Sequence, residues 1–152
     1  MEGYTKKGVR PVRGYSKSFY IWAAATLLCM GAIFLFSSFD AEESSQKSSY
    51  LTNMMFGSVA LESFVRKSAH FIVFAVLGFC AANTFKHRLS GKKLFLVSSG
   101  FASIYAVTDE LHQYFVPGRS CQLSDWLIDT AGALFGVSAA FIVLYAYAKR
   151  RR

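Results

Sequence analysis

The chain has 152 residues, of which 53% are hydrophobic and 17% are charged, and its formal net charge is +8. This length leaves room for one domain, and so high a hydrophobic content argues against a water-soluble helical bundle. The basic residues flank apolar runs and do not form one basic face with interleaved aromatic residues, which argues against nucleic acid as a partner.

Thirteen of the 17 Lys and Arg residues fall in three clusters that alternate with four apolar runs. Cationic segments stay on the cytoplasmic side of a membrane, so the alternation predicts a four-span protein with both ends in the cytoplasm. The clusters are Lys6, Lys7, Arg10, Arg13 and Lys17; Lys86, Arg88, Lys92 and Lys93; and Lys149, Arg150, Arg151 and Arg152.

The apolar runs have the length of membrane helices. A hydrocarbon core of about 30 Å requires roughly 20 helical residues. We predict an all-α polytopic fold with spans at about 19–39, 69–85, 94–113 and 125–148. The basic segments 1–18 and 149–152 are then cytoplasmic, and 19–148 forms the membrane domain. The runs show no strand alternation, which argues against a small barrel.

The first run also resembles a secretory signal, because a basic leader precedes it. Its apolar stretch of about 21 residues is longer than the 7–15 residues of a signal core, and no small-x-small cleavage site follows. We therefore expect an uncleaved anchor. Cys29 and Cys80 fall within spans, and Cys121 stands alone in an outer loop, so no disulfide or CxxC motif is expected.

The predicted topology brings distant polar residues to one depth at the outer face. A carboxylate at the centre of a membrane helix costs about 2.5–3.5 kcal/mol, and such residues usually pair inside the bundle and mark a site. The residues at this depth are Lys67, His70, Asp109, Glu110, His112, Gln113, Arg119, Asp125 and Asp129.

Helical spacing aligns these residues with small ones. Asp125, Asp129, Gly132 and Gly136 share one stripe of the last span, and Gly-x-x-x-Gly allows two helices to approach closely. We therefore predict close packing in the inner leaflet and a polar cleft at the outer surface. The Pro117-Gly118 turn is expected to present Arg119 to the helix ends, as a bridge between carboxylates or a site for an anion.

These residues carry a resemblance to the VanZ-like family. The resemblance runs from about residue 36 to 136. It rests on Phe36-Ser37-Ser38, Lys67-x-x-His70, Asp109-Glu110-x-x-Gln113-x-Phe115-x-Pro117-Gly118-Arg119 and Asp125-x-x-x-Asp129-x-x-Gly132-x-x-x-Gly136. One departure is Asp129, where the family often has Asn. The resemblance implies a multi-pass protein of the bacterial cytoplasmic membrane, linked to reduced susceptibility to the glycopeptide teicoplanin. It implies no particular reaction.

Three functions fit the polar residues. In an enzyme acting on a lipid-linked or surface substrate, Glu110 or Asp109 would be the base and His70 its proton partner, while Lys67 and Arg119 hold an anionic group. In a binding or transport module, Lys67 and Arg119 would recognise an anionic lipid or a glycopeptide, and Gln113, Asp125 and Asp129 would complete the site. Transport by four spans would require an oligomer.

The third function is structural, with the polar residues as an ion-pair network. Lys67 and Arg119 neutralise only two of four carboxylates, so this alternative leaves negative charge unexplained. No cofactor is identifiable from the sequence. His70, Asp109, Glu110 and Asp125 offer hard metal ligands, but there is one deep His and no HExxH spacing, so we predict no metal site.

Overall fold

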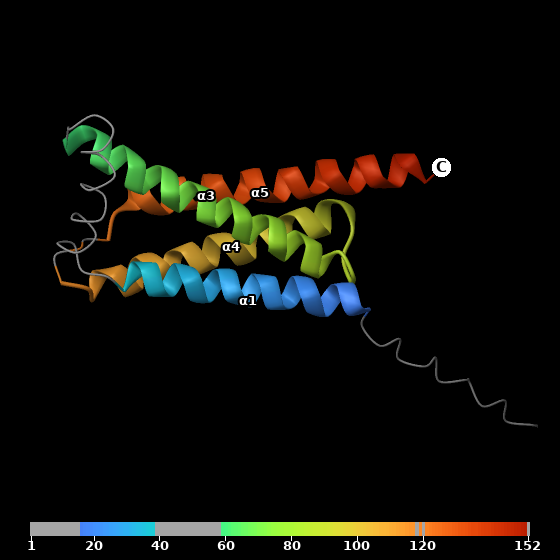
Figure 1. Cartoon of the computed structure of the whole chain (residues 1–152), viewed down its shortest axis with the longest axis horizontal. Coiled ribbons are helices and arrows are strands. Elements are labelled where there is room, and N and C mark those ends of the chain that lie inside the picture. Colours follow the sequence, from blue (N-terminus) through green and yellow to red (C-terminus); the bar gives the residue numbers. More distant parts are fainter. Residues whose placement is uncertain (1–15, 39–58, 118, 120, 152) are drawn as a thin grey trace, which may run out of the picture.

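The computed structural model describes residues 16–38, 59–117, 119 and 121–151, with the side chains of the second segment described from Phe64 onward. These residues form four α-helices and no strand (Figure 1). The helices are α1 (Lys17–Ser37), α3 (Val59–Phe85), α4 (Gly91–Tyr114) and α5 (Leu123–Arg150). All four are long and apolar enough to cross a membrane, which confirms the predicted all-α, four-span fold.

The helices extend beyond the predicted apolar runs. α1 begins at Lys17, where the Ser16 hydroxyl accepts a hydrogen bond from the backbone N–H of Phe19 at 3.4 Å. α3 begins at Val59, ten residues before the predicted span, and its apolar part begins at Phe64. Hydrophobicity marks the part of a helix that can face lipid, whereas the helix itself includes polar residues outside that part, such as Glu62.

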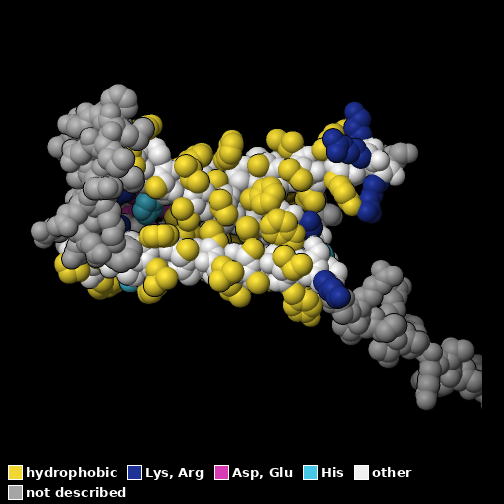
Figure 2. Space-filling model, viewed as in Figure 1, with side chains coloured by type: hydrophobic (Ala, Val, Ile, Leu, Met, Phe, Trp, Pro, Cys, Tyr) yellow, Lys and Arg dark blue, Asp and Glu magenta, His cyan; other side chains and the backbone are white. Residues whose placement is uncertain are grey.

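The four helices alternate in direction along the bundle (Figure 1). One end of the bundle therefore holds the start of α1, the connection between α3 and α4, and the end of α5. Lys and Arg side chains gather at the end where α5 finishes, and hydrophobic side chains cover the length of the bundle (Figure 2). This arrangement puts the described members of the three basic clusters at one end. That this end is cytoplasmic remains a prediction from the charge rule.

The closest packing in the bundle lies between α3 and α5, and α3 also contacts α1 and α4. A Cβ atom at Gly132 would meet the backbone carbonyl of Phe71, and one at Gly136 would meet that of Ala75. Gly78 of α3 lies equally close to the backbone of Ala133. The Gly-x-x-x-Gly stripe of α5 therefore packs on α3, and this contact sets the distance between polar residues on the two helices.

α1 is the least covered of the four helices, and polar contacts join it to its neighbours. The Tyr105 hydroxyl of α4 donates to the Met30 carbonyl at 2.7 Å, and the hydroxyls of Thr26 and Thr84 lie 3.1 Å apart. The first contact joins α1 to α4, and the second joins α1 to α3. The last residue of α1, Ser37, is buried.

Candidate functional site

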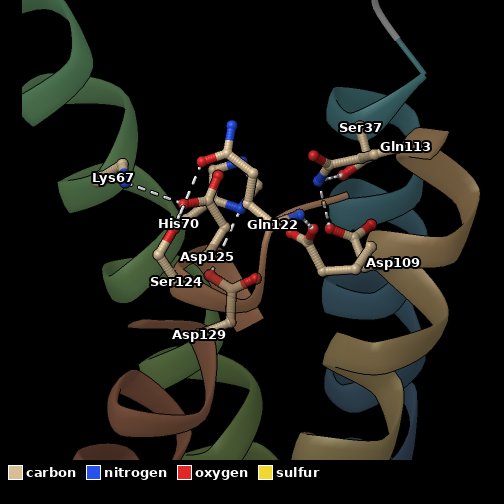
Figure 3. A network of polar contacts seen from close by, with 10 residues as sticks. Ser37, Lys67, His70, Asp109, Gln113, Gln122, Ser124, Asp125 and Asp129 are labelled. Carbon is tan, nitrogen blue, oxygen red and sulfur yellow. Dashed lines mark hydrogen bonds and ion pairs between the residues drawn. The ribbon is translucent and has the colours of Figure 1, made fainter. Parts of the chain in front are cut away.

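Polar side chains from all four helices converge in one network (Figure 3). They lie where α1 and α4 end and α3 and α5 begin, at the end of the bundle opposite the basic clusters. Ser37 comes from the last turn of α1. Lys67 and His70 come from α3, Asp109, Glu110 and Gln113 from the end of α4, and Asp125 and Asp129 from the start of α5. The convergence results from the alternating helix directions, which bring two helix ends and two helix starts together.

Two pairs join α3 to α5, one helical turn apart. The Lys67 ammonium lies 3.0 Å from Asp125 Oδ1, and His70 Nδ1 lies 3.5 Å from Asp129 Oδ1. A spacing of three residues on α3 matches a spacing of four on α5, so both pairs fall on the facing sides of the helices. The first pair is partly exposed, with 36% and 21% of its side chains accessible. The second pair lies deeper.

Asp129 is the most buried of these carboxylates, with 0% of its side chain exposed. Among the described residues, neither carboxylate oxygen of Asp129 has a hydrogen-bond partner. The 3.5 Å separation from His70 Nδ1 is too long for a strong hydrogen bond. A buried carboxylate without such partners is costly in free energy.

The polar residues of α4 form two further sets of contacts. Gln113 Nε2 donates to Asp109 Oδ2 at 2.8 Å and to the Ser37 hydroxyl at 3.4 Å. Glu110 Oε2 accepts the backbone N–H of Gln122 at 2.9 Å, while the buried Oε1 has no hydrogen-bond partner in the described part of the chain. Asp109 is therefore oriented by a neighbouring amide, and Glu110 keeps one free oxygen.

Arg119 lies half-buried in the connection between α4 and α5, among these charges. Burial lowers its pKa and the charge of Arg66 lowers it further, whereas Asp109, Glu110 and Asp125 raise it. A guanidinium keeps its proton under these conditions, so Arg119 adds a permanent positive charge to the site. Gly118, which was expected to form the turn before it, lies outside the described residues.

His112 belongs to a different contact, although it lies on the same helix end. Its Nε2 is 3.1 Å from the Ser38 hydroxyl, and its ring stacks on Phe34 with centroids 4.4 Å apart. This imidazole therefore joins α4 to α1 and does not face His70 or Asp129.

The structure brings the eight predicted site residues to one end of the bundle, but it pairs them differently from the expectation. His70 lies against Asp129, whereas the sequence suggested Glu110 or Asp109 as its proton partner. Four residues that the sequence analysis did not assign to the site also belong to it. These residues are Ser37, Arg66, Gln122 and Ser124, whose hydroxyl donates to Asp125 Oδ1 at 3.0 Å.

The sequence could have indicated only some of these four residues. Arg66 directly precedes Lys67, so it falls near the same turn of α3. Gln122 contributes a backbone N–H, which no side-chain pattern reveals. Ser37 lies at the end of α1, and its partner Gln113 is 76 residues away in the sequence.

One group of these residues has the composition of a metal site. His70, Asp109 and Asp129 each offer a ligand atom, and these atoms lie within 4.8 Å of one another. The set differs from the hard ligands considered from the sequence, because it includes Asp129 in place of Glu110 and Asp125. The three residues come from three helices, so the packing of these helices determines which ligand atoms lie close together.

Comparison with known proteins adds one match. A family model described as VanZ/LLP1 matches residues 22–145 of the chain. This range includes every residue of the polar site and extends from the first turns of α1 nearly to the end of α5. No curated protein and no solved structure matches the chain.

Proposed function

The chain belongs to the VanZ/LLP1 family, and from this we propose that it binds an anionic lipid-linked or surface ligand at the polar end of its bundle. We place this end at the outer face of a bacterial cytoplasmic membrane. In this position the protein would lower the susceptibility of the cell to a glycopeptide such as teicoplanin.

The observation that carries the proposal is a layered arrangement of charge. Arg66, Lys67 and Arg119, here called the cationic rim, are all partly exposed. Behind the rim lie buried carboxylates, of which Asp129 and Glu110 retain oxygens without hydrogen-bond partners among the described residues. A purely structural network would satisfy its buried members first, so these oxygens favour a site for a ligand that brings hydrogen-bond donors as well as its anionic group.

The cationic rim has the chemistry of a phosphate or carboxylate site. A guanidinium can bind an anion through two parallel N–H donors, and an ammonium adds a point charge. Arg119 and Arg66 supply the guanidinium groups of the rim, and Lys67, which lies 3.0 Å from Asp125, adds its ammonium. A lipid-linked ligand would reach them from the membrane surface without crossing the bilayer.

An enzymatic function is the second candidate, and Glu110 favours it. Its Oε1 is buried and has no hydrogen-bond partner in the described part, while its Oε2 is held by the Gln122 N–H. A carboxylate fixed by one oxygen and free at the other suits a general base. If Glu110→Gln removes the phenotype but leaves ligand binding unchanged, the enzymatic function is supported over simple binding.

The first test compares Arg119→Gln and Arg119→Lys with the parent chain in nanodiscs, using a fluorescent polyprenyl phosphate as the probe. Loss of a charged hydrogen bond of about 1.5–3 kcal/mol predicts roughly 10- to 100-fold weaker binding by Arg119→Gln. Arg119→Lys should recover only part of this, because an ammonium cannot bind in the bidentate mode. Nanodiscs of phosphatidylglycerol serve as competitor to separate a lipid-linked ligand from a bulk head group.

The same variants are then scored for teicoplanin susceptibility in a sensitive bacterium, at matched membrane abundance. Lys92→Gln is the control, because Lys92 is exposed at the opposite end of the bundle. Unchanged binding and unchanged susceptibility in Arg119→Gln would show that Arg119 does not recognise an anion and would contradict the proposal.

A further inference from the structure

We propose that His70, Asp109 and Asp129 bind a divalent metal ion. Their ligand atoms all lie within 4.8 Å of one another, so a single point exists within about 2.8 Å of each atom. Bonds of about 2.0–2.2 Å then require each atom to move by at most about 0.6–0.8 Å. Movements of this size are within reach of side-chain rotation. The three ligands come from α3, α4 and α5, so the ion would also join three helices.

Asp129 supplies an observation independent of the spacing. Its side chain is 0% exposed, and neither of its oxygens has a hydrogen-bond partner in the described part of the chain. Placing a carboxylate in such surroundings costs several kcal/mol unless a counter-charge compensates it. His70 at 3.5 Å is the nearest ion-pair partner, and Lys67 is committed to Asp125 one turn away. A metal ion between Asp129 and Asp109 would neutralise both carboxylates.

Gln113 acts as a positioning residue for this site. Its Nε2 donates to Asp109 Oδ2 at 2.8 Å and so fixes the orientation of this carboxylate. Such hydrogen bonds from outside the ligand set orient a ligating carboxylate and change metal affinity. The Ser37 hydroxyl lies 3.4 Å from the same amide nitrogen, so α1 supports the orientation of Asp109.

The chemistry of the three ligands indicates which metal ions would bind. One imidazole and two carboxylates suit Zn²⁺ or Mn²⁺, whereas Mg²⁺ and Ca²⁺ prefer ligand sets made entirely of oxygen. Three protein ligands also leave at least one coordination position for water or an anionic oxygen, as in catalytic rather than structural zinc sites.

The metal would change the charge balance of the polar end. Among the described residues, Asp109, Glu110, Asp125 and Asp129 face the three cations of the rim, so the carboxylates exceed these cations by one. A divalent ion would reverse this excess and favour an anionic ligand. Metal binding does not depend on the proposed function, because it requires neither an anion nor a glycopeptide.

The test measures metal content in the purified full chain. The protein in detergent is first stripped of metal with EDTA, and it is then incubated with Zn²⁺ or Mn²⁺ and dialysed. The metal bound per chain is measured by inductively coupled plasma mass spectrometry. We expect about one equivalent per chain, and a Tm that rises with metal concentration. Asp129→Asn, His70→Gln and Asp109→Asn should each weaken binding at least 10-fold, and Gln113→Leu about 10- to 100-fold.

Two comparisons separate metal loss from unfolding. His112→Gln is the matched control, because His112 lies on the same helix end but contacts Ser38 and Phe34. Asp129→Asn removes a buried charge whose ion-pair partner among the described residues is His70 at 3.5 Å, so in EDTA it should melt near the parent Tm, and metal should no longer raise its Tm. Equal metal content in the parent and the three ligand variants, or no bound metal in the parent, would overturn the proposal.

Discussion

Two aspartates on one helix show how surroundings divide the roles of identical side chains. Asp125 is 21% exposed and bonded to both Lys67 and Ser124, whereas Asp129, one turn deeper, is fully buried. The first carboxylate has the contacts of a structural ion pair. The second lacks hydrogen bonds from the described residues and is therefore the better candidate for a ligand site.

The Lys67–Asp125 pair is predicted to contribute modestly to stability. A double-mutant cycle with Lys67→Met and Asp125→Asn should give a coupling energy of about 1 kcal/mol or less, because both side chains are partly exposed. The Ser124 hydroxyl can still donate to the Asn side chain, so the cycle isolates the ion pair. Unfolding in increasing SDS provides the measurement. A coupling energy well above 1 kcal/mol would contradict this prediction.

At the scale of elements, the α3–α5 contact sets the geometry of the site. Gly132 and Gly136 let the two backbones approach until a Cβ at either position would meet a carbonyl group of α3. His70 and Asp129 lie at the same contact, one turn or less from Phe71 and Gly132. A change in the distance between these helices therefore changes the polar site as well as the packing.

Gly136→Ala tests this coupling. The added methyl group would meet the backbone carbonyl of Ala75, and the α3 backbone cannot move aside without separating the two helices. We expect a loss of about 1–3 kcal/mol in the free energy of unfolding. Metal affinity should fall in parallel, because His70 and Asp129 would move apart.

Gly31→Ala and Gly100→Ala are matched controls, since nothing lies within 4 Å of a Cβ at either position. Replacing a helical glycine at an open position should stabilise the protein by about 0.5–1 kcal/mol. A Gly136→Ala protein as stable as these controls would show that α3 and α5 are not in close contact in the membrane.

At the scale of the whole molecule, the two ends of the bundle carry different kinds of polar residues. The described basic residues of the three clusters lie at one end, and the polar site lies at the other. The charge rule places the basic end in the cytoplasm, which makes the site extracytoplasmic. A cationic end also binds anionic lipid head groups, at about 1 kcal/mol per residue near the surface.

Cys121 offers a native probe of this orientation, because it is exposed at the polar end, whereas Cys80 is buried. A membrane-impermeant maleimide should label intact cells through Cys121, and Cys121→Ser should abolish the labelling. With Lys92→Cys added to that variant, labelling should return only after permeabilisation. Labelling of Lys92→Cys in intact cells would place the polar site on the cytoplasmic side.

The sequence alone determined the number of spans and the end of the bundle at which the polar residues meet. Both follow from local properties, since hydrophobic length sets each span and the order of spans sets which ends lie together. Helical spacing also placed Asp125, Asp129, Gly132 and Gly136 on one stripe. The family match over residues 22–145 agrees with the resemblance drawn from these motifs.

Only the tertiary structure decided the partners within the site. His70 faces Asp129, Gln113 orients Asp109, and the Gln122 backbone holds Glu110. Helical spacing gives the face on which a residue lies, but the rotation and separation of neighbouring helices determine which faces meet. In this bundle, the rotation and separation of α3 and α5 follow from contacts between glycines and backbone carbonyl groups. A pattern of side chains in the sequence does not reveal which carbonyl group each glycine meets.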